Sequence, residues 1–367
     1  MYIYERKGWP NFQWDQLKIA EHLAPIRYRA GRLIGKMESL GFSLQSEAVL
    51  QTMIVEALKT SEIEGEFLDK EQVRSSIARQ LGMDVSGLIA SDRNVDGLVE
   101  ILIDATKNYK SRLTKERLFS WHAALFPTGR NGLKKIRVGQ WRTNDKEPMQ
   151  VVSGAVGREK IHFEAPISKD VPKEMLLFLK WFNTENETDP VIKAAIAHLW
   201  FLTIHAFEDG NGRLARTIAD LQLSRADGIS QRFYGMSAQI RLERKSYYNA
   251  LEKTQKGSLD ISDWIEWFLL CYDKSLTSAE ITLAGVIRKA RYWEFLGTKI
   301  LNERQKLLLN KLLDKFEGKL NTSKWAKIAK CSQDTALRDI QNLVEQGVLL
   351  KNESGGRSTS YLLKELE

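Results

Sequence analysis

Residues 205–216 read His205-Ala206-Phe207-Glu208-Asp209-Gly210-Asn211-Gly212-Arg213-Leu214-Ala215-Arg216, and this stretch is the most informative part of the 367-residue sequence. It lies between two apolar patterns at helical spacing, one from Val191 to Ile204 and one from Ala215 to Leu223. The stretch is therefore expected to be a loop that opens onto the N-terminus of a helix. Its two glycines allow the backbone to turn tightly, so that backbone amides can point at a ligand.

The residue types in this loop suit one anion site with one base. Consecutive amides at a helix start form a positive pocket for phosphate. Arg213 and Arg216 are three residues apart, so both guanidinium groups can face the same phosphate chain. Asp209 offers hard oxygen ligands for Mg²⁺ shared with the phosphates. His205 has an ordinary pKa near neutrality and could accept a hydroxyl proton during attack on phosphorus.

The stretch HAFEDGNGRLAR resembles the signature of the Fic family, H-x-F-x-[D/E]-G-N-G-R-x-x-R, at every fixed position. Ala206 stands where the family usually has proline. Ala197-His198 before the motif and Arg244 to Leu251 after it resemble the flanking elements, so the resemblance covers roughly residues 90–275. It implies a mainly α-helical fold: a Fic helical core with a β-hairpin flap.

The resemblance also implies a role for each motif residue. The chain would transfer AMP from ATP to a hydroxyl side chain of a target protein by in-line attack on the α-phosphorus, with pyrophosphate leaving and with ATP and Mg²⁺ required. The protein would act mainly by positioning and charge stabilisation. The implied roles are His205 as general base, Phe207 as core anchor of the loop, Asp209 as Mg²⁺ ligand, Gly210, Asn211 and Gly212 as cradle of the phosphates, and Arg213 and Arg216 as holders of the distal phosphates.

A second motif lies upstream, at Thr60-Ser61-Glu62-Ile63-Glu64-Gly65. It resembles the inhibitory motif [S/T]-x-x-x-E-[G/N] of many Fic proteins. Thr60 and Glu64 are one helical turn apart and share a face, and Gly65 fits a helix C-terminus. The resemblance implies that Glu64 pairs with Arg216 and occupies the place of the γ-phosphate, which makes Glu64 an inhibitory residue. The alternative is a solvated acidic cluster.

A hairpin is predicted from Met149 to Phe163, where two apolar runs flank the turn region Ser153–Gly157. It stands where the Fic family has its flap, and the resemblance implies that a target protein docks at residues 149–163 by strand addition. Tyr248 follows the core and could stack on adenine, as could Tyr247, although both could equally be core aromatics.

Three domains are expected: an N-terminal helical domain at 1–85 that carries the inhibitory motif, a Fic core at 90–290, and a winged-helix domain at 295–367. The last domain is predicted from helices at 302–316, 322–330 and 333–346, a closing Gly347, and two short strand-like runs that begin at Val348 and Tyr361. Arg338 on its third helix, with Lys351 and Arg357 in the wing, could contact DNA. Such a domain also serves as a packing module.

Composition sets weaker limits. The chain is 43% hydrophobic and 28% charged, and its formal net charge of +8 permits an anionic partner. The two cysteines make neither a disulfide framework nor a zinc site. The sequence has no signal-like segment and no apolar run long enough to cross a bilayer, so a cytoplasmic location without membrane attachment is expected. A homodimer is left open.

Two alternatives to AMP transfer remain from the sequence. One is a transcription regulator, in which the core senses nucleotide and the winged helix binds DNA. The other is removal of AMP from a modified protein, in which Glu64 would activate water.

Overall fold

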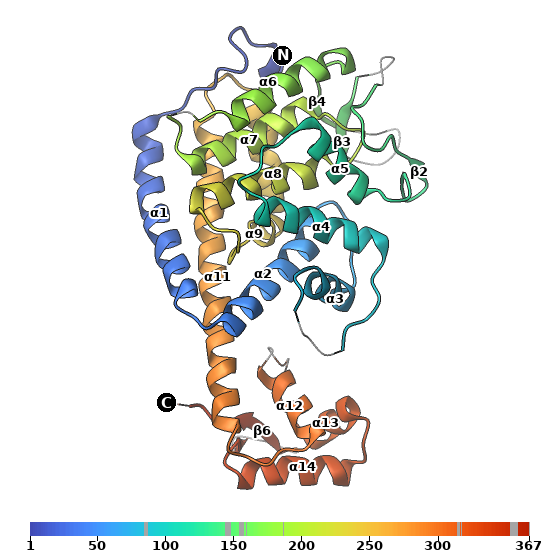
Figure 1. The fold of residues 1–367 in the computed structure, drawn as a ribbon, viewed down its shortest axis with the longest axis vertical. Coiled ribbons are helices and arrows are strands. Elements are labelled where there is room, and N and C mark those ends of the chain that lie inside the picture. The colour runs from blue at the N-terminus through green and yellow to red at the C-terminus, as the bar shows by residue number, and fades with distance from the viewer. Residues whose placement is uncertain are drawn as a thin grey trace. The chain divides into compact units, whose positions relative to one another are not determined.

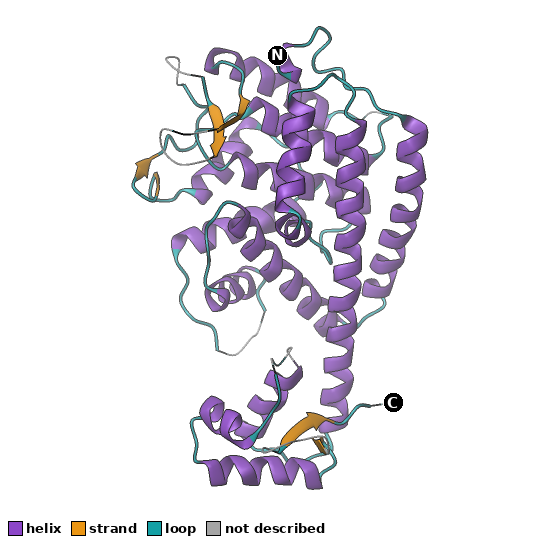
Figure 2. Cartoon of the chain, turned by 180° about the vertical axis from the view of Figure 1, so that it is seen from behind, coloured by secondary structure: helices purple, strands orange, loops and turns teal. Residues whose placement is uncertain are grey.

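The fold is described from a computed structural model, which covers residues 1–83, 87–143, 148–153, 158, 160–185, 187–313, 316, 318–352 and 359–366. Helices dominate, and the described strands form three small antiparallel hairpins (Figure 2). The mainly α-helical fold predicted from the sequence is confirmed. Within the described residues, every helix is too short or too polar to span a lipid bilayer.

The chain divides into two compact units, Met1–Thr282 and Leu283–Glu367. The division falls inside the long helix α11, Ser262–Leu296. Each unit is described separately below.

At the centre of the first unit, α7 packs against α8 (Figure 1). Every residue of α7 after its first, Pro190, is buried, because its sequence is apolar on all sides. The side chain of Asp189 caps the helix by accepting a hydrogen bond from the Val191 amide at 2.7 Å. α8 begins immediately after Gly210 and ends before Gly228, and both glycines are left-handed. The bounds of the two helices are Pro190–Ile204 and Asn211–Asp227.

The N-terminal part of the first unit brings the inhibitory motif to this centre. After the short helix η1 (Ile3–Glu5), α1 runs beside α11, with Lys18 2.7 Å from Glu266. α2 packs on α9 and reaches α8. The helices are α1 Gln16–Glu38, α2 Phe42–Ile63 and α3 Lys70–Gln80.

The remaining elements of the first unit surround α7 and α8. α4 and α5 approach so closely that a side chain at Gly97 would lie 1.9 Å from the Ala124 carbonyl oxygen, so this contact requires glycine. The elements are α4 Arg93–Lys107, α5 Lys115–Leu125, β1 Arg130–Asn131, β2 Lys134–Lys135, β3 Gln150–Ser153, β4 Lys160–Glu164, η2 Ser168–Asp170, α6 Val171–Asn183, α9 Ser237–Leu242 and α10 Arg244–Gln255.

The predicted hairpin at 149–163 is confirmed, because β3 and β4 pair antiparallel with Val151 opposite Phe163. A bulge between Val151 and Val152 shifts the register. Most of the predicted turn, at 154–157, lies outside the described residues.

The second unit has its own apolar core, built around Trp325, Ile340 and Leu343. Its element order agrees with the prediction for the C-terminal region, and Gly347 is left-handed after the last helix (φ 69°). Arg357 lies outside the described residues. The elements are α12 Glu303–Leu313, α13 Thr322–Ala329, α14 Gln333–Glu345, β5 Leu349–Asn352 and β6 Ser360–Leu363.

Candidate functional site

The loop between α7 and α8 is a tight turn with a left-handed residue at each end. His205 is the C-terminal cap of α7 (φ 52°, ψ 56°), and Gly210 is the N-cap of α8 (φ 79°). The side chain of Asn211 closes the turn, since its Oδ1 accepts from the Phe207 amide at 3.0 Å and its Nδ2 donates to the Phe207 carbonyl at 2.8 Å. The Asn211 side chain therefore holds the loop closed.

Phe207 anchors the loop in the core. Its ring is fully buried and stacks on His122 of α5 at a centroid distance of 4.2 Å. Nδ1 of His122 accepts from the Gly139 amide at 3.1 Å, so Nε2 carries the proton and donates to the Asp209 carbonyl at 3.3 Å. Nothing in the spacing of His122 links it to the motif, so the sequence alone did not predict its contact with the loop.

His205 carries a neutral imidazole. Burial, aided by the nearby charge of Arg142, lowers the pKa of His205 to about 4. The ring is therefore unprotonated at neutral pH and can accept a proton from a hydroxyl group.

The guanidinium of Arg216 is buried against the end of α2. Its Nε donates to Thr60 Oγ1 at 2.8 Å, and its Nη2 donates to the Thr60 carbonyl at 3.0 Å and to Glu64 Oε1 at 2.7 Å. The resemblance of residues 60–65 to an inhibitory motif implies this pairing of Glu64 with Arg216, and the structure contains it. Arg244 of α10 fixes the same segment by donating to the Ile63 carbonyl at 3.0 Å.

A second carboxylate pairs with the other motif arginine. Glu66 Oε2 lies 2.7 Å from Nη1 of Arg213, and the Arg213 guanidinium also stacks over the Phe126 ring. Left-handed Gly65 (φ 85°) turns the chain between the two glutamates. From the sequence alone Glu66 is only one member of an acidic cluster, because its partner Arg213 is distant in the chain.

The two arginines keep donors that no described residue satisfies. Nε of Arg213 and Nη1 of Arg216 are buried and lack an acceptor among the described residues. Unpaired buried donors are costly, so these N–H groups fit further anionic oxygens such as those of a phosphate chain.

Glu64 lies where an anion at the start of α8 would bind. A Cβ added to Gly212 would lie 2.3 Å from Glu64 Oε1, so the carboxylate rests against the glycine backbone in the first turn of the helix. Helix N-termini favour negative charge at this position.

Asp209 directly precedes Gly210, the N-cap of α8. Its Oδ1 accepts from the Gly210 amide at 2.6 Å and its Oδ2 from Asn131 Nδ2 at 2.8 Å. Among the described residues, no cluster of three or more His, Cys, Asp or Glu forms a complete protein cage for a metal. A single carboxylate fits Mg²⁺, which commonly takes its other ligands from water and substrate phosphates.

The two tyrosines after the core have different surroundings. Tyr247 is buried, and its hydroxyl lies 2.9 Å from His198 Nε2, which makes it a core residue. Tyr248 is partly buried, with the Arg244 guanidinium 5.0 Å from its ring centre. Of the two, Tyr248 is therefore the candidate for stacking on a base.

The hairpin β3–β4 is tied to α10 through His162. Its Nδ1 lies 2.5 Å from Glu252 Oε2 and its Nε2 lies 2.6 Å from Ser153 Oγ. Val152 and Ile161 face each other across the strands and are 47% and 44% exposed. The hairpin is thus anchored at one side and presents apolar side chains to solvent.

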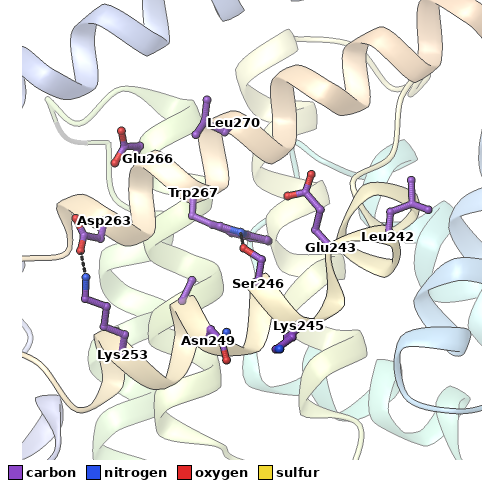
Figure 3. Close-up of a pocket in the computed structure, with 11 residues that line it drawn as sticks. Leu242, Glu243, Lys245, Ser246, Asn249, Lys253, Asp263, Glu266, Trp267 and Leu270 are labelled. Carbon is purple, nitrogen blue, oxygen red and sulfur yellow. Dashed lines mark hydrogen bonds and ion pairs between the residues drawn. The ribbon is translucent and has the colours of Figure 1, made fainter.

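A groove of about 750 Å³ lies elsewhere in the first unit, along α10 and α11 (Figure 3). Trp267 crosses it and donates to Ser246 Oγ at 3.0 Å, and an ion pair between Lys253 and Asp263 closes one end. None of the residues lining the groove belongs to the 205–216 motif.

Two family models match the chain. The model described as Fic/DOC family matches residues 112–223, and a model described as a domain of unknown function (DUF4172) matches residues 2–83.

Among curated relatives, a protein adenylyltransferase Fic of Drosophila ananassae is 26% identical over 263 residues, which is 68% of this chain and 47% of the relative. A protein of the same name from Drosophila mojavensis is 28% identical over 220 residues, 58% of this chain and 38% of the relative. The chain thus spans less than half the length of these relatives.

Several solved structures share the fold, including the two that follow. A Fic family protein from Desulfovibrio desulfuricans G20 aligns over 97% of this chain and 98% of its own, with 19% identity and a TM-score of 0.54. A Fic domain containing signaling protein from Bacteroides thetaiotaomicron VPI-5482 aligns over 73% of this chain and 97% of its own, with 20% identity and a TM-score of 0.51.

The buried histidines predict a loss of stability in mild acid. Burial lowers the pKa of His122 and His205 to about 4 and that of His198 to about 3, whereas an unfolded histidine titrates near 6.5. Below pH 6.5 the unfolded chain takes up protons that the folded chain refuses, so stability present above pH 6.5 is lost as the pH falls towards 4. We expect the free energy of unfolding to fall by roughly 1–2 kcal/mol per buried histidine between pH 6.5 and 5.

Urea unfolding at several pH values tests this expectation. His122→Gln should flatten the pH dependence of the free energy of unfolding, because it removes one of the groups with a lowered pKa. If the free energy of unfolding falls equally with pH in the wild type and in His122→Gln, the expectation is wrong.

Proposed function

Because residues 112–223 form a Fic/DOC-family domain, we propose that this chain is a protein adenylyltransferase, which transfers AMP from ATP to a hydroxyl side chain of a target protein. The names of the Drosophila relatives support the proposal. The observation that carries it is the neutral His205 imidazole at the C-terminal end of α7, one tight turn before a helix N-terminus flanked by two buried arginines.

In the proposed reaction, the imidazole of His205 takes the proton of the target hydroxyl as its oxygen attacks the α-phosphorus. A new O–P bond forms, the bond between the α-phosphorus and the bridging oxygen breaks, and pyrophosphate leaves. The protein contributes mainly position and charge, since phosphoryl chemistry needs little covalent help.

The phosphate chain would lie at the N-terminus of α8. The unsatisfied donors Arg213 Nε and Arg216 Nη1 support this position, as does the glycine backbone at 210 and 212. Asp209 would hold Mg²⁺, which would offset phosphate charge when bound. Tyr248 would stack on the adenine.

Glu64 would act as a brake. Its carboxylate pairs with Arg216 and lies against Gly212, so the distal phosphates of ATP would compete for the same donors. The pair with Arg216 is made to a guanidinium that is 97% buried, which favours a specific contact over a loose surface charge.

The target protein would dock on the hairpin β3–β4. An extended peptide could add to an edge of this hairpin, with the exposed Val152 and Ile161 providing apolar contact.

The first prediction concerns the base. His205→Ala should abolish transfer of labelled AMP to protein while ATP binding persists, because the imidazole moves the proton but is not needed to hold the phosphates. Labelling with α-³²P-ATP and equilibrium binding of ATP measure the two effects, and His22→Ala provides a control at a partly exposed histidine outside the site. Undiminished labelling by His205→Ala would rule out His205 as the base.

The second prediction concerns the brake. Glu64→Gly should raise AMP transfer about ten- to a hundredfold, because it removes a charged hydrogen bond worth about 1.5–3 kcal/mol that competes with ATP. Glu62→Gly is the matched control, since Glu62 contacts Lys59 and Arg241 but neither motif arginine. If both variants transfer AMP at the wild-type rate, the brake assignment fails.

The same variant separates transfer from the reverse activity. If Glu64 activates water to remove AMP from a modified protein, Glu64→Gly should raise transfer and abolish removal. Incubation of a pre-labelled target with each variant distinguishes the two roles.

A second candidate function is nucleic-acid binding by the C-terminal unit. Residues 283–367 hold 16 Lys and Arg against 10 Asp and Glu, so most of the net charge of +8 lies there. The exposed side of α14 presents Arg338, Gln341 and Asn342, which are side-chain types that contact phosphates and bases. A chain of this kind would combine the nucleotide site with a DNA-binding domain, as in a transcription regulator.

A gel shift with a 20-base-pair duplex tests this second function. We expect binding at about 50 mM salt that weakens steeply towards 200 mM, because phosphate contacts release counterions. Arg338→Glu should weaken the shift, while Lys245→Glu, the same charge change at an exposed position in the first unit, should not. Absence of a shift at low salt would indicate that this unit is a packing module.

A further inference from the structure

A buried arginine that belongs to neither sequence motif holds the backbone on both sides of His205. Arg142 follows β2 in the chain and is 3% exposed. Its Nε donates to the His205 carbonyl at 2.7 Å and its Nη2 to the Ile204 carbonyl at 3.4 Å, while its backbone amide donates to the Ala206 carbonyl at 3.0 Å. One residue therefore contacts three consecutive carbonyl groups centred on the base.

This backbone needs such support. His205 has a left-handed conformation, which costs a residue with a Cβ roughly 1–2 kcal/mol, so other contacts must hold it. The side chain and the backbone amide of Arg142 together hold three carbonyl groups in place. These contacts keep the backbone of His205 from relaxing to ordinary right-handed helical geometry.

Arg142 also connects the base to the hairpin. Its Nη2 donates to the Pro166 carbonyl, and Pro166 follows β4 closely in the chain. The hairpin that would receive the target and the residue that would deprotonate its hydroxyl thus share one rigid guanidinium group.

The surroundings of Arg142 are unusual for a buried cation. Among the described residues, the Arg142 side chain donates its hydrogen bonds to backbone carbonyl oxygens. No carboxylate of the described residues forms an ion pair with it. Burial accordingly lowers the pKa of Arg142 to about 10. A cation kept at this cost beside a proposed base suggests a role beyond packing.

We propose that Arg142 is the positioning residue for His205, which holds the left-handed backbone of the base and fixes the base relative to the foot of the hairpin. This inference rests on the proposed transfer activity. The positive charge of Arg142 would have a second effect, because it opposes protonation of the imidazole and keeps the base ready at neutral pH.

The test uses the full chain with Glu64→Gly as the background, so that transfer is measurable. Arg142→Lys keeps the positive charge, but its single ammonium group cannot reach several carbonyl groups at once. Arg142→Gln removes both the charge and the planar guanidinium group. Arg225 offers a matched control, because it also donates to backbone carbonyls, those of Tyr109 and Ser111, and burial likewise lowers its pKa to about 10.

We expect kcat for AMP transfer to fall about tenfold or more in Arg142→Lys and about a hundredfold in Arg142→Gln, with the Kd of ATP changed less than about threefold. Arg225→Lys and Arg225→Gln should lower Tm without this loss of kcat. Similar loss of kcat in both series, or retained kcat in Arg142→Gln, would overturn the proposal.

A second measurement separates positioning from mere stability. NMR titration of ¹⁵N-labelled histidine should show the pKa of His205 rising in Arg142→Gln and staying low in Arg142→Lys and both Arg225 variants. Asp209 and Glu64 also influence this imidazole, so every variant is compared within the same Glu64→Gly background. An unchanged His205 pKa in Arg142→Gln would contradict the inference. If the Glu64→Gly variant transfers no AMP, the proposed function fails. The titration would still show whether Arg142 lowers the pKa of His205.

Discussion

The guanidinium groups of Arg213 and Arg216 lie buried at the N-terminus of α8, where the helix dipole adds further positive charge. Two positive charges buried side by side are costly unless anionic oxygens neutralise them. In this structure Glu64 and Glu66 supply those oxygens, one to each arginine. In the proposed catalytic state the phosphates of ATP would replace them. The ion pairs of Glu64 and Glu66 with these arginines also join the end of α2 and the residues after it to α8. The brake is therefore also part of the packing of the first unit.

The base depends on a different set of contacts. His205 is neutral because desolvation lowers the pKa of its imidazole, and its backbone is left-handed at the end of α7. Three segments hold this turn: α5 through His122, the segment after β2 through Arg142, and α8 through the side chain of Asn211. The proton acceptor and the anion site are therefore supported separately. A change in the brake removes none of the hydrogen bonds that hold the backbone at His205.

The second unit has its own core and most of the chain's net positive charge, so it can be considered apart from the transfer chemistry. A DNA-binding role would add a second function to the chain without altering the arrangement around His205. We expect DNA binding by this unit to depend on salt. We expect the first unit, which holds all five histidines, to lose free energy of unfolding in mild acid.

The sequence by itself determined the features that depend on short spacing. The 205–216 motif, the helices and the hairpin at β3–β4 could be predicted, because residues one turn apart share a helix face and turn residues bound each element. The pairing of Glu64 with Arg216, which are far apart in the chain, was implied only by the resemblance of residues 60–65 to an inhibitory motif. Only the tertiary structure placed His122, Glu66 and Arg142 at the site, assigned Tyr247 to the core, and committed the Asn211 side chain to the loop. The partners of His122, Glu66 and Arg142 lie far away in the chain, so packing decides those contacts. Local periodicity likewise does not specify burial, which lowers the pKa of His205.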